Sequence, residues 1–174
     1  MNFKIKAGKR TSDNTCKMRM VSGRTLRFRF KLNASCQYDH ERIINGWNRV
    51  FGVSPIFSKG SCDLLFMQDR DQLTLAMQVT YKTSSSCFNT SILKRMITVC
   101  PGVWHWCEIS YFKNSFGHWV YYMRFDHENI FDPPFWWQME APASFIPGMF
   151  LRHPALGGRY ILDDDIDMDI ELIK

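Results

Sequence analysis

The sequence lacks any apolar run long enough to cross a membrane, and its N-terminus, MNFKIKAGKR, lacks the apolar core of a signal peptide. A transmembrane helix needs about 20 consecutive, mainly apolar residues, and a signal peptide also depends on an apolar stretch. We therefore expect no membrane span. A secreted form of the protein would be a mature chain or would leave the cell by another route.

Short motifs of metal, nucleophile and phosphate chemistry are also missing. The six cysteines form no Cys-x-x-Cys pair and have no spacing to histidine that suits zinc; they are Cys16, Cys36, Cys62, Cys87, Cys100 and Cys107. No Ser/His/Asp or phosphate-loop signature is present. Disulfides in an oxidising compartment and buried free thiols explain the even number of cysteines equally well.

The sequence is rich in apolar and aromatic residues. Apolar residues make up 45% of the 174 residues and aromatic residues 15%, with 14 Phe and 6 Trp. A chain of this length and composition can bury a full hydrophobic core. We therefore expect a single globular domain over residues 1–174.

The net charge of +5 is distributed unevenly along the chain. Residues 1–31 hold ten Lys or Arg against one acid, and residues 163–174 hold six acids against one Lys. One interpretation of the basic end is a surface for phosphates or acidic glycans. We favour the alternative of solvent-facing strand residues, because the charges alternate with apolar residues at period two. A nucleic-acid partner is not expected.

The two charged ends also predict a pairing between strands. Lys4 and Lys6 alternate with Phe3 and Ile5, and the acids of residues 165–172 alternate with Ile and Met. If the first and last strands lie side by side, Lys faces Asp or Glu on the wet face and the apolar residues share the buried face.

Most of the chain reads as short strands separated by turns. Residues 103–112 and 118–126 predict a hairpin, and residues 62–68 and 72–80 predict a second one. Residues 132–154 contain five of the seven prolines, and Pro133-Pro134 excludes a central strand, so this segment is predicted to be a long ordered loop. Ten to twelve such strands predict an antiparallel sandwich.

The segments VWHWCEISYF (103–112) and GHWVYYMRFDHENIF (117–131) carry a longer pattern. Trp104, His105 and Tyr111 resemble the Trp-His strand of laminin-G-like, concanavalin A-like jelly rolls, and Asp126 before the apolar residues 130–131 resembles the end of the next strand. The resemblance implies an all-β, antiparallel two-sheet β-sandwich of the concanavalin A-like jelly-roll type. Such a pattern identifies a fold better than a function.

Aromatic residues are the candidate binding groups. Sugar binding needs exposed aromatic rings, and the predicted loop supplies Phe135, Trp136 and Trp137, with Trp47 and Trp119 as further candidates. The same side chains would suit a contact with neighbouring protein subunits in an oligomer or larger assembly. The third interpretation is that they are core residues, as Trp in a sandwich usually is.

Two acidic motifs are candidate sites. The stripe of Asp167, Asp169 and Glu171 resembles the E-x-D-x-E strand of retaining glucanases, which places carboxylates on one face. It begins with Asp rather than Glu and lies at the end of the chain, so we favour a solvated edge strand. A second motif, Asp163, Asp164 and Asp165, could contribute oxygen ligands to a structural calcium ion, together with other loops.

A lyase site is the remaining candidate. Polysaccharide lyases of the resembled fold use a His-Tyr pair with Arg or Gln on a sheet face, where a base abstracts a proton beside a uronate carboxylate. His105 or His118, Tyr122 and Arg124 would supply such a set if the two histidines are neighbours across the hairpin. The alternative is that these are hydrogen-bonded sheet residues beside aromatic neighbours.

The sequence therefore favours a non-enzymatic, lectin-like binding or adhesion module that recognises glycans or a protein partner, with no catalytic residues and no cofactor other than the calcium ion. Two alternatives remain: a structural subunit of a virion or other large surface assembly, and a polysaccharide lyase or glycoside hydrolase on the same fold.

Overall fold

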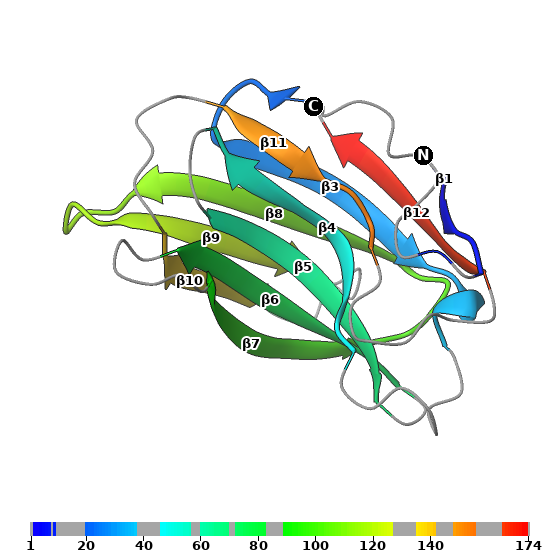
Figure 1. Ribbon diagram of the computed structural model, residues 1–174. Coiled ribbons are helices and arrows are strands. Elements are labelled where there is room, and N and C mark those ends of the chain that lie inside the picture. Colours follow the sequence, from blue (N-terminus) through cyan, green and yellow to red (C-terminus); the bar gives the residue numbers. More distant parts are fainter. Residues whose placement is uncertain are drawn as a thin grey trace.

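Two six-stranded antiparallel sheets pack face to face in the computed structural model, as Figure 1 shows. The structure describes residues 2–7, 9, 20–37, 46–56, 60–69, 72–82, 89–126, 135–141, 148–155 and 165–173. The all-β antiparallel sandwich predicted from the sequence is confirmed. Within the described residues, no helix is long and apolar enough to span a membrane.

The first sheet, sheet A, has the order β1-β12-β3-β8-β9-β10. Its strands are β1 (Asn2–Ile5), β12 (Ile166–Ile173), β3 (Thr25–Leu32), β8 (Trp104–Lys113), β9 (Trp119–Asp126) and β10 (Phe135–Glu140). Sheet B has the order β2-β11-β4-β5-β6-β7. Its strands are β2 (Met20–Val21), β11 (Met149–Arg152), β4 (Asn48–Pro55), β5 (Gly60–Asp69), β6 (Gln72–Lys82) and β7 (Asn89–Val99). A short 3-10 helix, η1 (Ala34–Cys36), follows β3.

The core lies between the two inner faces and is built by period-two alternation. Along β3 every second side chain is buried, beginning with Leu26, and the residues between them are exposed or half-buried. Phe28 and Phe51 meet edge to face across the two sheets with ring centroids 5.4 Å apart. The core is therefore aromatic-rich, as the composition predicted.

Both predicted hairpins are present. The strands β8 and β9 pair antiparallel from Trp106 opposite Asp126 to Lys113 opposite Trp119. The strands β5 and β6 pair from Gly60 opposite Tyr81 to Asp69 opposite Gln72, which makes this hairpin longer than predicted.

The predicted pairing of the two charged ends is confirmed. Lys4 lies opposite Asp167 in the ladder between β1 and β12, and its ammonium group lies 2.8 Å from the Asp165 carboxylate. The other edge of β12 pairs with β3, where Lys31 contacts Asp169 at 2.9 Å. The basic residues of β1 and β3 therefore face acids across the sheet, and the solvent-facing interpretation of the N-terminal charges holds for them.

The prediction of a continuous loop over residues 132–154 is wrong. The segment contributes two strands, β10 at the edge of sheet A and β11 inside sheet B. Pro133 and Pro134, on which the prediction depended, lie outside the described residues. A proline pair prevents regular strand pairing only in the backbone next to it. Apolar and aromatic residues further along the segment can still form strands that pair with their neighbours.

Four of the cysteines lie in described parts of the chain and are free thiols: Cys36, Cys62, Cys100 and Cys107. Burial raises the pKa of the Cys36 thiol to about 12, with a smaller contribution from Asp167 that is opposed by a backbone hydrogen bond from Asn33. Cys16 and Cys87 lie outside the described residues.

Candidate functional site

The outer face of sheet A brings together polar and aromatic side chains from four neighbouring strands. Its register forms two rows that run from β3 through β8 and β9 to β10. One row is Thr25, Ser110, Tyr122 and Gln138, and the other is Arg27, Glu108, Arg124 and Trp136. Because facing residues of antiparallel strands point to the same side, each row presents its side chains together.

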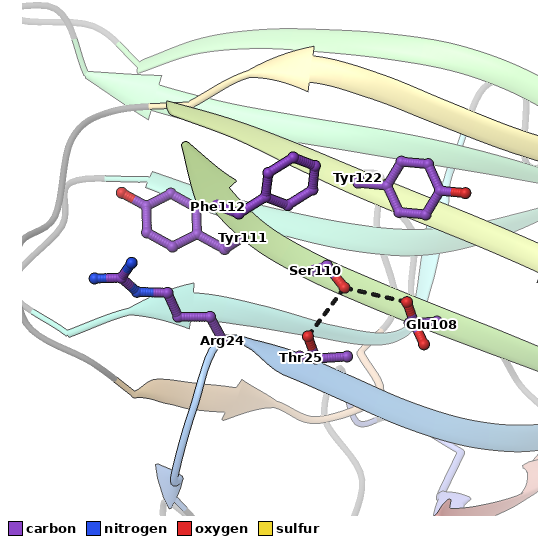
Figure 2. Close-up of a pocket in the computed structure, with 7 residues that line it drawn as sticks. All are labelled: Arg24, Thr25, Glu108, Ser110, Tyr111, Phe112 and Tyr122. Carbon is purple, nitrogen blue, oxygen red and sulfur yellow. Dashed lines mark hydrogen bonds between the residues drawn. The ribbon is translucent and has the colours of Figure 1, made fainter. Parts of the chain in front are cut away.

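A pocket of about 310 Å³ opens on this face, at the end nearest the β8–β9 turn. Figure 2 shows its lining: Arg24, Thr25, Glu108, Ser110, Tyr111, Phe112 and Tyr122. The Ser110 hydroxyl donates to the Glu108 carboxylate at 3.3 Å and lies 3.1 Å from the Thr25 hydroxyl. Arg27 donates from Nε to the other Glu108 oxygen at 2.6 Å. The pocket floor is thus a chain of hydroxyl and carboxylate groups held in place by an arginine.

Three aromatic rings cross the same face, and we call Phe112, Tyr122 and Trp136 the aromatic platform. The ring centroids of Phe112 and Tyr122 are 6.3 Å apart, and those of Tyr122 and Trp136 are 6.2 Å apart with planes only 22° from parallel. Trp136 is 60% exposed and Phe112 37%. The Phe112 ring is tilted 55° to that of Tyr122, so only Tyr122 and Trp136 are nearly parallel. Exposed rings on a rigid sheet suit stacking against a flat apolar ligand surface.

The two tryptophans of β8, Trp104 and Trp106, already have cations over their rings. Arg29 and Lys31 lie 4.7 and 5.2 Å from the ring centre of Trp104, and Arg124 lies 5.7 Å from that of Trp106. Such contacts are attractive at this range. The aromatic platform is therefore the part of the face that is best placed to receive a ligand ring.

The five aromatic residues predicted to bind a ligand do not form one surface. Phe135, Trp136 and Trp137 belong to β10 rather than to a loop. Trp136 lies on the platform, whereas Trp137 is partly buried against the core because alternation turns it to the inner face. The side chain of Phe135 lies outside the described residues.

Trp119 and Trp47 do not join the platform. Trp119 packs against the core, stacks on Tyr111 with ring centroids 4.8 Å apart and lies 4.6 Å from the Arg24 guanidinium. Trp47 is half-buried immediately before β4, in the other sheet. The core interpretation is the better one for Trp119.

Of the lyase candidates, Tyr122 and Arg124 share the outer face of sheet A, and the histidines do not. His105 is 4% exposed on the inner face, with ring centroids 5.6 Å from Phe30 and 5.5 Å from Phe125. His118 is exposed beside the turn at the opposite end of the hairpin. The expectation that the two histidines are neighbours is therefore wrong, because it used the strand pairing without the register.

The acidic candidates are largely engaged in ion pairs. Asp169 contacts Lys31, and Glu171 contacts Arg29 at 2.6 Å, which fits a solvated strand better than a pair of catalytic carboxylates. The predicted edge position is wrong, because β12 lies between β1 and β3 in the sheet. Asp165 accepts from the Ala7 N–H at 2.7 Å and contacts Lys4; these hydrogen bonds, with that of Lys4 first, lower its pKa.

Asp163 and Asp164 lie outside the described residues, so the calcium site stays a prediction. In the part of the chain that the structure describes, no three His, Cys, Asp or Glu side chains converge as metal ligands.

Sequence reasoning missed several residues of this face: Thr25, Arg27, Glu108, Ser110, Phe112 and Gln138. Period two does place Glu108, Ser110 and Phe112 on one side of β8. Their convergence with β3 and β10 depends on the order of strands in the sheet, which the residue pattern does not contain.

The fold is shared with solved polysaccharide-degrading enzymes. The alginate lyase Aly36B superposes with a TM-score of 0.62 at 9% sequence identity, over 98% of this chain and 78% of that one. The marine PL-14 alginate lyase from Aplysia kurodai superposes with a TM-score of 0.56 at 13% identity, over 98% of this chain and 80% of that one. No protein-family model and no curated protein sequence matches the chain.

At these identities the likeness establishes the shared jelly-roll sandwich fold. It also corrects the functional expectation: a non-enzymatic lectin-like or adhesion module is contradicted, because both of these structures are lyases.

Proposed function

We propose that the protein is a polysaccharide lyase that cleaves an acidic, uronate-containing glycan on the outer face of sheet A. The observation that carries the proposal is the register of β9 and its neighbours. It places Tyr122 between Ser110 and Gln138, with Arg124 two residues along the same strand face. The likeness to two alginate lyases supports it.

The reaction needs a proton acceptor, a positive charge and a donor to the leaving group. The Tyr122 phenolate accepts the proton from the carbon next to the uronate carboxylate, and Arg124 stabilises the negative charge that develops there. The electron pair of the broken C–H bond forms a C=C bond as the neighbouring C–O bond breaks. The leaving oxygen then takes the proton from Tyr122, which restores the phenolate.

The surrounding side chains suit the binding of such a chain. The aromatic platform stacks against sugar faces, and the Glu108, Ser110 and Thr25 string offers hydrogen bonds to sugar hydroxyls. Three arginines, Arg24, Arg27 and Arg124, and one carboxylate, Glu108, lie at or beside the pocket, so positive side chains outnumber negative ones there. An acidic glycan is therefore a better match than a neutral one.

The test is incubation of the purified protein with a panel of polymers: alginate, polygalacturonate, hyaluronate and neutral cellulose as the control. Elimination creates a C=C bond conjugated to a carboxylate, which absorbs in the ultraviolet. We expect such absorbance with at least one acidic polymer and none with cellulose. Absence of unsaturated ends with every acidic polymer, or reducing ends formed without them, would contradict the proposal.

A further inference from the structure

The β8–β9 hairpin ends in a well-defined turn that exposes a phenylalanine. The Asn114 side-chain oxygen accepts hydrogen bonds from the backbone N–H groups of Phe116 at 3.1 Å and His118 at 2.9 Å. Gly117 adopts φ 82°, a conformation that favours glycine, and its N–H donates to the Asn114 carbonyl at 2.9 Å. The turn therefore fixes the backbone at Phe116, and 84% of the surface of this residue is exposed.

The position of the turn links it to the proposed site. Figure 1 shows the β8–β9 hairpin projecting beyond the neighbouring strands. Phe112, which lines the pocket, lies at the base of the same turn, four residues before Phe116. Lys113 and His118 are exposed in the turn and add groups that can contact an anion. A single exposed apolar side chain needs no explanation, but this one lies at the end of the hairpin that carries Phe112 and Tyr122 of the aromatic platform.

We propose that Phe116 is a further sugar-stacking residue, which binds a part of the polysaccharide beyond the sugars that react at Tyr122. This inference rests on the proposed function. The occupant is an acidic glycan, because the ring can stack on a sugar face while Lys113 contacts a carboxylate of the chain. A long chain spans both the platform and the turn, and a short oligosaccharide occupies the platform alone.

The proposal predicts an effect that depends on substrate length. With the polymer that the wild type cleaves, Phe116→Ala should raise KM about two- to tenfold, the range expected for one lost aromatic contact. The kcat should stay unchanged, because bond cleavage takes place at Tyr122. For the shortest oligosaccharide that is cleaved, KM should also stay unchanged. Phe116→Trp should retain the wild-type KM for the polymer.

Two controls keep the test independent of folding and self-association. Ile92→Ala removes an exposed apolar side chain from β7, in the other sheet, and should change neither constant. Sedimentation of wild type and Phe116→Ala reports whether a second copy covers the ring instead.

Equal KM values for the polymer in wild type and Phe116→Ala would overturn the inference and leave the lyase proposal intact. A dimer that dissociates in Phe116→Ala with KM unchanged would also overturn it, by assigning the ring to an interface between copies. A wild type that neither binds nor cleaves any acidic polymer would overturn both proposals.

Discussion

Tyr121 and Tyr122 are adjacent on β9, but their side chains lie on opposite faces of sheet A. Tyr121 is fully buried in the core, and its hydroxyl has no hydrogen-bond partner among the described residues. Burial raises its pKa, with smaller contributions from Cys62, Tyr111 and Asp63. Tyr122 lines the pocket on the outer face.

The buried hydroxyl of Tyr121 predicts that Tyr121→Phe does not destabilise the fold. An unsatisfied buried polar group costs about 1–3 kcal/mol, so removal of the hydroxyl should leave the free energy of unfolding unchanged or raise it by about 1 kcal/mol. Urea denaturation of the two proteins checks this. Tyr122→Phe is the matched comparison on the same strand and should leave the stability unchanged. A loss of more than about 1 kcal/mol in Tyr121→Phe would show that the hydroxyl has a partner after all.

The strands β4, β5 and β11 share a charged cluster on the outer face of sheet B. The Asp63 carboxylate is 2% exposed and lies 3.0 Å from Arg152 Nε, although this contact does not have the geometry of a hydrogen bond. Gly52 makes room for it, because a Cβ at this position would clash with Asp63 Oδ1. Burial raises the pKa of Asp63, and Arg152 and Arg49 oppose that shift.

A raised pKa means that the folded state favours the neutral carboxyl group. This preference stabilises the folded state fully when the pH is below 3.8, the ordinary pKa of an Asp carboxyl group. The stabilisation is lost as the pH rises through the higher pKa that Asp63 has in the folded state. At neutral pH, Arg152→Ala should therefore cost about 3 kcal/mol, since it leaves a buried charge with less compensation. Asp63→Asn should cost less than about 1 kcal/mol, since it supplies a neutral group of the same shape.

Unfolding measured as a function of pH checks both values. The penalty of Arg152→Ala should shrink as the pH falls, and it should begin to do so above the ordinary carboxyl pKa of 3.8, because the pKa of Asp63 is raised in the folded state and the group takes up its proton there. A penalty that is the same at acidic and neutral pH would show that Arg152 acts through packing, not through the charge of Asp63.

Strand-level features were largely predictable, because they depend on alternation within one segment. The β8–β9 hairpin and the pairing of β1 with β12 follow from period-two patterns of apolar and charged residues. The strand β10 was not predicted, because the effect of Pro133-Pro134 was extended to the whole segment. A proline excludes a regular strand only in its immediate neighbourhood. The position of His105 could be predicted only in part. Alternation places His105 and Cys107 on the same face of β8, but the residue pattern does not show which face packs against the core.

For the whole molecule, the decisive information is the order of strands in the sheet. Tyr122 and Arg124 could be named from the sequence, whereas Gln138 and Glu108 could not. The former pair share one strand, and the others join them only because β8 and β10 flank β9. A face that combines a phenol, a guanidinium and exposed rings is therefore a property of the assembled sheet. The lyase function that we propose rests on that face and on the likeness to lyases, in place of the binding module expected from the sequence.

The most direct measurement compares three proteins on the acidic polymer that the wild type cleaves. Tyr122→Phe should lower kcat about 100-fold or more, because it removes the group that transfers the proton, while circular dichroism and the midpoint of urea unfolding stay unchanged. Tyr121→Phe alters the same kind of side chain one residue away, on the buried face, and should keep wild-type kcat. Full activity in Tyr122→Phe, or equal losses in both variants, would contradict the assignment of catalysis to the outer face of sheet A.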